Sequence, residues 1–294
     1  MRRSVVPVLL LALLVALATG LASTAAARSA RTPMQLLRAY APVLALHPSE
    51  RFQPEPVDGF LADSDLVAGH YDQRLCHSID GPAALDCYAQ ADAAHALAPA
   101  VYGALFRTST RIVLEYWLFY PFDLYSTTDP PGEIWQDHEG DWEAVAVVLD
   151  AKEKPLLVGT SRHCGGARRD WSRVTRRGTH PLVYVALGSH ANFFAPGELR
   201  QDTSCWPKVA VAILRAYGIV LRDHVAAGRT VAPAVLPVTA RTPSWMAFSG
   251  AWGESQYVHF PNNAPFAFGL GPVGPAFHAL WRKPLATVLS WPRG

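Results

Sequence analysis

Runs of apolar residues of strand length fill the middle of this chain. Ile112 to Phe122 is dense in β-branched and aromatic residues, and similar runs follow at Trp142 to Leu149, Pro155 to Gly159 and Leu182 to Leu187. Glycine, proline or charged residues separate these runs, as is typical of buried strands. With a shorter run from Val43 to Leu46, the pattern predicts a β-sheet core.

Helical patterns lie on either side of this centre. Thr32-Pro33 is typical of a helix N-cap and first turn, and predicts a short helix to about Tyr40. Ala89 to Leu105 is rich in alanine and predicts a second helix, which a proline interrupts. From Val209 to Ala227 apolar residues recur at roughly helical spacing, which predicts a third helix.

Proline and glycine break up the other segments. Gln53 to Asp65 predicts an irregular surface segment, Pro233 to Pro243 is interrupted by proline, and the tail from Pro261 predicts loops. Trp245 to Gly250 is a last strand candidate. The order of helix, sheet, helix and strand shows no βαβ alternation. It therefore favours a mainly β protein, a β-sandwich with peripheral α-helices, over a doubly wound sheet.

The first 27 residues have the composition of a secretory signal peptide. Arg2 and Arg3 are positive, Val8 to Leu17 is apolar but too short to span a bilayer, and Ala25 to Ala27 offers small residues for cleavage. A membrane anchor is the alternative, but no second apolar span follows. We therefore expect residues 1–27 to be a signal peptide and residues 28–294 to be a single secreted domain.

The charge balance argues against one class of partner. The chain has 26 Lys+Arg and 24 Asp+Glu, and removal of the two leader arginines makes the two counts equal. A protein without net charge has no general attraction to nucleic acid. One domain is favoured over two, because no low-complexity linker and no internal repeat is visible.

Four cysteines follow the predicted leader, and an even number in an exported protein favours disulfides. Three pairings are possible. We prefer Cys76 with Cys87, which closes a short local loop, and Cys164 with Cys205, which ties two distant loops. The absence of any CxxC motif argues against a metal site made of cysteines.

A dense group of ionisable residues, Asp137-His138-Glu139-Gly140-Asp141-Trp142-Glu143, precedes the apolar run from Ala144. In an extended strand Asp141 and Glu143 point to one side and Trp142 to the other. Two adjacent carboxylates repel each other, so they require a cation, a shared proton or full hydration. His138, on a turn just before, is near enough to join them. The alternative interpretation is a solvated acidic turn.

Several segments resemble the vacuolar protein sorting-associated protein 62 family. In chain order they are Tyr40 to Leu44, His47 to Phe52, Pro56 to Asp58, Asp141 to Glu143, Val183 to Asn192, Gly250 to Glu254 and Gly271-Pro272. The similarity covers most of the chain after the leader. The activity of that family is poorly defined, so this resemblance implies little about function.

A more distant resemblance is to the necrosis- and ethylene-inducing-like proteins, whose hallmark is Gly-His-Arg-His-Asp-Trp-Glu. Residues 137–143 agree with it at four of seven positions, and Phe119 to Asp123 resembles the family's Tyr-Phe-Pro-x-Asp-like segment. That family has a β-sandwich that holds a divalent cation and docks on glycosylated lipids. The resemblance implies these cation ligands: Asp123, His138, Asp141 and Glu143. Glu139 and Gly140 depart from the hallmark, which leaves lipid specificity and cytolytic activity unsupported.

Three carboxylates and one imidazole make an oxygen-rich site, which favours Ca²⁺ or Mg²⁺, with Mn²⁺ as a third candidate, over Zn²⁺. His163 and His190 each end a predicted strand, and with Glu139 and Ser189 they are candidates for the mouth of this site. The alternative for each histidine is a hydrogen-bonded loop residue. Ser189 does not predict a nucleophile, because no Gly-x-Ser-x-Gly turn surrounds it.

A positive segment of six arginines runs from Arg162 to Arg177 and surrounds a tryptophan. Such a segment is suited to anionic lipid headgroups or acidic glycans. The candidates for this contact are Arg168, Arg169, Trp171, Arg173, Arg176 and Arg177. The alternative is a solvated loop tied down by Cys164.

These patterns together predict a secreted, cation-binding β-sandwich that docks on a glycan or lipid headgroup at a membrane surface. The first alternative is a secreted metal-dependent hydrolase of phosphate or glycoside esters, in which the cation activates water. The second is a structural module of the cell envelope, in which the cation braces loops. The sequence predicts neither a catalytic residue nor an oligomeric state.

Overall fold

The computed structural model describes residues 31–76, 81–127, 134–254, 256–259, 265–269 and 271–294. The signal peptide predicted over residues 1–27 lies outside the described residues, as does part of the tail after Pro261. Thr32 to Gly294 forms one compact unit. Within the described ranges, no helix combines the length and the apolar character needed to cross a membrane.

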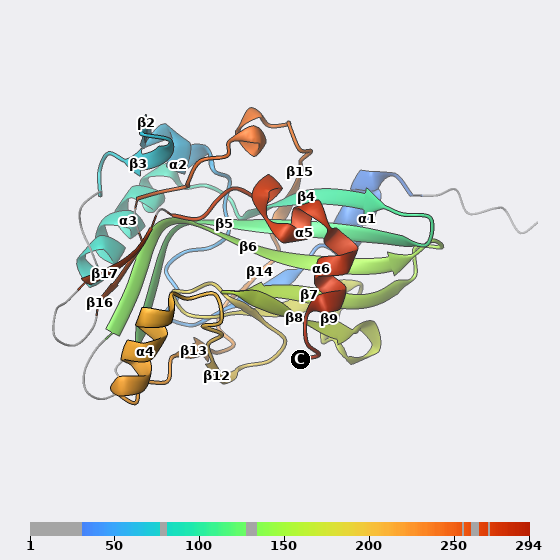
Figure 1. Ribbon diagram of the computed structural model, residues 1–294. Coiled ribbons are helices and arrows are strands. Elements are labelled where there is room, and N and C mark those ends of the chain that lie inside the picture. The colour runs from blue at the N-terminus through green and yellow to red at the C-terminus, as the bar shows by residue number, and fades with distance from the viewer. Residues whose placement is uncertain (1–30, 77–80, 128–133, 255, 260–264, 270) are drawn as a thin grey trace, which may run out of the picture. The chain divides into compact units, whose positions relative to one another are not determined.

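A long antiparallel hairpin organises this unit (Figure 1). Its strands β5 (Arg111–Thr127) and β6 (Ile134–Asp150) pair along their whole length. β4 pairs with the free edge of β5, and both β7 and β16 pair with β6. In the described part of the chain this sheet has eight strands. The other six are β4 (Ala100–Arg107), β7 (Pro155–Arg162), β8 (Gly165–Asp170), β15 (Ala234–Pro237), β16 (Gln256–His259) and β17 (Pro265–Gly269).

A smaller sheet packs against one face of the large one. It is centred on β1 (Val43–Leu46), which runs parallel to β10 (His180–Val185). Its other strands are β9 (Arg176–Arg177), β11 (Asn192–Phe193) and β14 (Thr230–Val231). Leu44 and Val183 from this sheet share a buried cluster with Leu114 and Val145 from the hairpin. The protein is thus mainly β, with a core between two sheets, as the sequence predicts.

The opposite face of the large sheet is covered by aromatic residues and helices. Trp117, Phe119 and Trp142 point to this face and pack with Trp252 and Trp281. The short helices α5 (Ala279–Arg282) and α6 (Pro284–Ser290) lie over it near the C-terminus (Figure 1). Apolar side chains on both faces explain why the hairpin strands are continuous apolar runs and not alternating ones.

Local signals predict some elements well. α1 (Pro33–Tyr40) begins where expected, because the Thr32 hydroxyl accepts a hydrogen bond from Gln35 N in a capping box. β1 has the predicted bounds. α4 (Lys208–Ala216) is shorter than the predicted helix, since the chain turns at Gly218 with a φ of +69° and then enters β13 (Arg222–Val225). β13 pairs with β12 (Gly197–Arg200).

Other predictions are wrong. The alanine-rich segment from Ala89 to Leu105 divides into α3 (Gly81–His95) and β4, because packing between two apolar layers overrides the helical preference of alanine. Trp245 to Gly250 contains a 3₁₀ turn, η2 (Ser244–Ala247), in place of a strand. The segment predicted as irregular contains α2 (Asp58–Ala62). The remaining elements are β2 (Ser64–Val67), β3 (His70–Gln73), η1 (Trp171–Arg173) and η3 (Pro275–Phe277).

Candidate functional site

The acidic motif lies within the long hairpin and does not precede a strand. His138 belongs to β6 and sits opposite Asp123 of β5, so the prediction of a turn at His138 is wrong. In a regular strand His138 and Asp141 would face opposite sides. Gly140 has a φ of +54°, which interrupts the alternation. Both side chains therefore line the same cleft.

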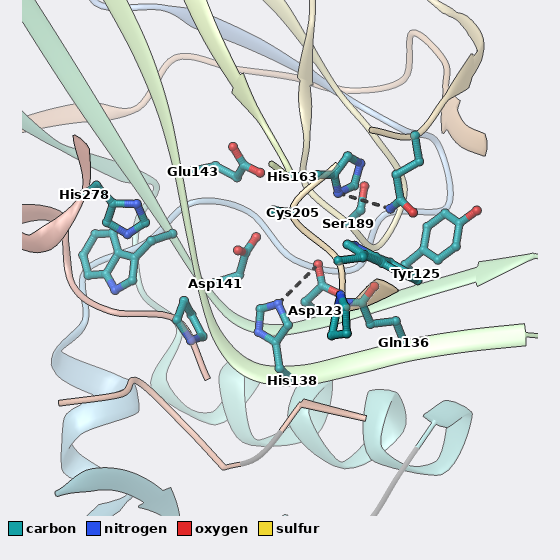
Figure 2. Close-up of a pocket in the computed structure, with 15 residues that line it drawn as sticks. Asp123, Tyr125, Gln136, His138, Asp141, Glu143, His163, Ser189, Cys205 and His278 are labelled. Carbon is teal, nitrogen blue, oxygen red and sulfur yellow. Dashed lines mark hydrogen bonds and ion pairs between the residues drawn. The ribbon is translucent and has the colours of Figure 1, made fainter. Parts of the chain in front are cut away.

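The cleft has a volume of about 400 Å³ and lies at the bend of the hairpin (Figure 2). Its lining includes all four predicted cation ligands, from two strands: Asp123, His138, Asp141 and Glu143. The Asp123 Oδ2 and His138 Nε2 atoms are 4.0 Å apart. Oxygens of Asp123 and Asp141 and a ring nitrogen of His190 all lie within 4.8 Å of one another. The fold thus gathers oxygen and nitrogen donors at one place.

The acidic groups of this cluster are buried, and this changes their ionisation. Burial, and secondly the Asp141 carboxylate, raise the pKa values of Asp123 and Glu143 well above their ordinary range. Burial lowers the pKa of His138, which favours the neutral imidazole that a metal requires. Glu143 accepts hydrogen bonds from Ser161 Oγ and, at 3.5 Å, from Asn192 Nδ2. This donor set matches a hard divalent cation.

His190 lies beneath the cleft and is fully buried. Its Nδ1 is 3.0 Å from Asp141 Oδ2, its Nε2 is 3.6 Å from Glu50 Oε1, and its ring stacks on Tyr120 at 3.8 Å. Burial alone lowers the pKa of His190, but the carboxylates of Glu50 and Asp141 outweigh it and raise the pKa to about 10. The imidazolium therefore holds Asp141 in place from behind.

The other residues predicted to lie at the mouth of the site have different positions in the structure. His163 and Ser189 line the cleft. Glu139 does not, because it faces away, accepts a hydrogen bond from Tyr88 and holds the amide of Glu254 at 3.1 Å. Together with Asp72, Glu139 and Glu254 form a second acidic group whose oxygens lie within 4.8 Å of one another.

Sequence reasoning missed two residues that organise the site. Glu50 binds His190 and accepts a hydrogen bond from Gly188 N at 2.8 Å. Its only signal was its place in a segment that carries a family resemblance. Asp223 contacts both His163 and Ser189. It fell within a predicted helix, where nothing marked it as a site residue.

The arginine segment lies outside the cleft, since none of its candidate residues contributes to the lining. Arg168 and Arg169 donate to the carbonyls of Trp291 and Gly294, each at 2.9 Å. Arg176 stacks over Trp171 at 4.9 Å. Arg177 Nη1 donates to Thr230 at 3.2 Å, and Arg173 is exposed. Several of these arginines therefore stabilise the fold.

Both preferred cysteine pairings are present, and the described residues hold no free cysteine. Cys76 bonds to Cys87, and Cys164 bonds to Cys205. Cys205 lines the cleft, so the second disulfide fixes part of the cleft wall.

Comparison with known proteins finds similar proteins in both groups that the sequence motifs resemble. No model of a known protein family matches the chain. Vacuolar protein sorting-associated protein 62 of Saccharomyces cerevisiae is 26% identical over 223 residues, or 66% of this chain and 46% of that protein. The resemblance to this protein is confirmed. The chain spans less than half the length of its Saccharomyces relative.

Solved structures with a similar arrangement are proteins of the second family that the sequence resembles. NLPPya in complex with glucosamine matches with a TM-score of 0.46 and 15% identity, over 87% of this chain and 90% of that one. NLPPya in complex with mannosamine gives a TM-score of 0.44 and 14% identity, over 87% and 91%. Necrosis and Ethylene inducing Protein 2 from the causal agent of cocoa's Witches Broom disease gives 0.34 and 14%, over 70% and 76%.

Proposed function

We propose that the protein binds a divalent cation in the cleft of the β5–β6 hairpin and uses it to dock on a sugar. The crowding of Asp123, Asp141 and Glu143 carries this proposal. Three buried carboxylates repel one another, and a cation both relieves this repulsion and stabilises their ionised forms. Ca²⁺ and Mg²⁺ take oxygen ligands of this kind, and Mn²⁺ is a third candidate.

The size of the cleft supports a second ligand beside the ion. A volume of about 400 Å³ is far larger than one cation needs and falls within the range of small-molecule sites. A cation that the protein binds from one side keeps open coordination positions for the hydroxyl groups of a glycan or a glycosylated headgroup. Glucosamine and mannosamine, present in the NLPPya structures, are convenient first probes.

The proposal places the protein outside the cell. Two disulfides support this, because disulfides persist mainly in oxidising compartments. The predicted signal peptide agrees with it.

A metal-dependent hydrolase is the second candidate function. Its support is His138, whose neutral imidazole nitrogen lies 4.0 Å from Asp123 in the same cleft. With the cation held by the carboxylates alone, this nitrogen is suited to accept a proton from a water. The cation would lower the pKa of such a water. Turnover of phosphate or glycoside esters distinguishes this function from docking. A protein that binds the cation but neither docks on a sugar nor hydrolyses these esters would be a structural module.

Calorimetric titration of metal-stripped protein with Ca²⁺, Mg²⁺ and Mn²⁺ tests the cation site. We expect the parent to bind and the Asp141→Asn/Glu143→Gln variant to lose binding. The control is Asp65→Asn/Glu198→Gln, which removes the same charge from two exposed residues outside the cleft. Retained binding in the Asp141/Glu143 variant, or no binding by the parent, would refute the site.

A further inference from the structure

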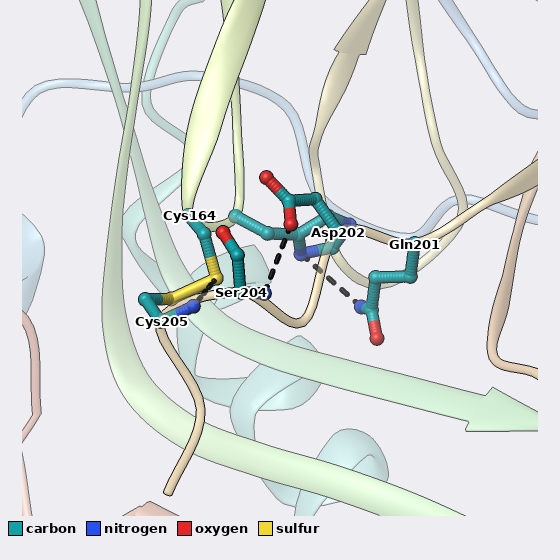
Figure 3. Close-up of a disulfide and its surroundings, with 6 residues drawn as sticks. Cys164, Gln201, Asp202, Ser204 and Cys205 are labelled. Atoms are coloured by element: carbon teal, nitrogen blue, oxygen red, sulfur yellow. Dashed lines mark hydrogen bonds between the residues drawn. A yellow bond between two sulfur atoms is a disulfide. The ribbon is translucent and has the colours of Figure 1, made fainter. Parts of the chain in front are cut away.

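The two disulfides of this protein brace two different cavities. Cys164–Cys205 lies at the wall of the cleft (Figure 3). Cys76–Cys87 instead ties the helix α3 to the segment that precedes it. α3 forms one wall of a second cavity, which has a volume of about 220 Å³. None of the described residues that line this second cavity also lines the cleft.

The walls of the second cavity are mainly apolar and come from four parts of the chain. Phe52 follows β1, Leu85 belongs to α3, Leu124 belongs to β5, and Leu187 follows β10. Leu85 and Leu187 are partly exposed, so a ligand can reach these walls from solvent. Apolar walls that stand apart lose dispersion contacts, and an apolar ligand between them would restore these contacts.

The position of α3 is fixed by contacts outside the second cavity. Tyr88 of α3 stacks on Phe122 of β5 with ring centroids 4.4 Å apart, and it donates a hydrogen bond to Glu139. The neighbouring Cys87 carries the disulfide. These contacts keep α3 from closing onto the segment that contains Leu187. A site formed in advance loses little entropy when a ligand binds.

The one acidic group in the wall is already engaged. Of the described residues that line the second cavity, Glu50 is the only acid and Arg51 the only base. The Glu50 carboxylate accepts hydrogen bonds from Arg51 N, Phe52 N and Gly188 N at 2.8 to 3.0 Å. It also lies 3.6 Å from His190 Nε2, whose imidazolium balances its charge. Glu50 therefore leaves the Arg51 guanidinium as the charged group that a ligand meets.

The Arg51 guanidinium is accessible at the edge of the second cavity. Its side chain is 41% exposed and pairs with Asp86, whose side chain is 68% exposed. Asp86 directly follows Leu85 on α3, so this pair joins α3 to the segment after β1. An ion pair this exposed contributes little to stability, so a carboxylate from a ligand can replace Asp86 at little cost.

We propose that the second cavity binds a medium-chain carboxylate, with its aliphatic tail between the leucines and its carboxylate on Arg51. Apolar walls beside a single available cation match the two ends of such a molecule. A volume of about 220 Å³ is below that of drug-sized sites, which restricts the ligand to one short chain. The ligand is therefore a free acid and not a membrane lipid. This site does not depend on the proposed cation.

Calorimetric titration with octanoate, butyrate and 1-octanol tests the proposal, with a chelator present so that no divalent cation takes part. We expect octanoate to bind at least roughly tenfold more tightly than butyrate, because four more methylene groups leave water. Octanol keeps the long tail without the charge. It should bind roughly two- to fivefold more weakly than octanoate, as expected for the loss of one exposed ion pair.

Two substitutions of exposed residues locate the ligand. Ser49 also lines the second cavity, and Ser49→Trp should abolish octanoate binding by filling the entrance. Ser244→Trp, at an exposed position outside the cavity, is the matched control. Arg51→Gln should remove the preference for octanoate over octanol and leave octanol affinity unchanged. Arg74→Gln is its control, because Arg74 forms a similarly exposed ion pair with Asp65.

Four results would each overturn this inference. Octanoate does not bind the parent, binds no more tightly than butyrate, or binds Ser49→Trp as tightly as it binds Ser244→Trp. The fourth is a preference for octanoate over octanol that persists in Arg51→Gln. The chelator separates all four results from the cation site, so they leave the proposed function untouched.

Discussion

Individual buried carboxyl groups behave in opposite ways in this protein, according to what each one touches. Glu50 is buried, which alone would raise its pKa, but His190 and two backbone amides outweigh this and lower the pKa to about 2. Glu115 is also buried, and among the described residues it receives one hydrogen bond, from Trp117, so burial raises its pKa to about 8. A side chain of the same chemistry is thus ionised at one site and neutral at the other.

Glu115→Gln should change how stability depends on pH. The folded pKa of about 8 lies above the ordinary value of 4.5, so the fold binds a proton that the unfolded chain releases. This contribution is fully present below pH 4.5 and is lost as pH rises toward 8. We expect the free energy of unfolding of the variant, minus that of the parent, to be larger at pH 9 than at pH 5 by at least about 1 kcal/mol. Urea unfolding at both pH values measures this, and parallel profiles would contradict it.

Asp123→Asn should separate stability from cation binding. Because the pKa of Asp123 is raised well above its ordinary range, the metal-free fold must hold this carboxyl group protonated at neutral pH, at a cost in stability. Asparagine removes this cost, so the melting temperature of the metal-free protein should rise by roughly 2–4 °C. With saturating Ca²⁺ the order should reverse, because the parent binds the ion more tightly and gains more stability from it. Calorimetric melting with chelator and with Ca²⁺ measures both. A variant that is less stable in both conditions would argue against repulsion at this site.

Among the elements, β6 contributes most to the site, because Gly140 interrupts the regular alternation of its side chains. A regular strand would send His138 and Asp141 to opposite faces, and the left-handed conformation of Gly140 brings both into the cleft. A Cβ at Gly140 would lie 2.4 Å from the carbonyl oxygen of Trp252, so both the conformation and the space require glycine.

Gly140→Ala should therefore damage stability and site together. We expect a loss of about 2 kcal/mol or more in the free energy of unfolding, from the positive φ and the clash, and a weaker affinity for Ca²⁺. Gly178→Ala is the matched control. That residue also has a positive φ, +62°, but nothing lies within 4 Å of its added Cβ. The Gly178→Ala variant should lose only the smaller part of the free energy of unfolding, the part that comes from the positive φ. Its Ca²⁺ affinity should not change. Equal effects of the two changes would contradict the role of Gly140.

In the whole molecule the cleft and the arginine segment are separate features. The cleft collects side chains from the hairpin, from Ser189 after β10 and from Gln201 between β12 and α4. The arginines of β8, η1 and β9 do not line it. Sugar binding and attraction to an anionic membrane surface are therefore expected to depend on different residues.

Arg173→Gln/Arg177→Gln tests the membrane prediction. If these arginines meet anionic headgroups, binding to vesicles that contain phosphatidylserine should weaken, and binding of the parent should fall with added salt. Ca²⁺ and glucosamine titrations should not change. Arg215→Gln/Arg241→Gln, at two exposed positions elsewhere, serves as control. Salt-independent vesicle binding, or an equal effect of both variants, would remove the support for headgroup contact.

The sequence by itself was sufficient for features that depend on near neighbours. The long apolar strands, the capped start of α1, the shared side of Asp141 and Glu143 and the short Cys76–Cys87 loop could all be predicted, because spacing and capping are local. Tertiary structure alone decided the strand identity of β4, where burial between two layers overrides the preference of alanine for helix. It also placed Glu50, Asp223 and Gln201 around the cleft. Their roles depend on partners more than 30 residues away, and no local pattern encodes such distances.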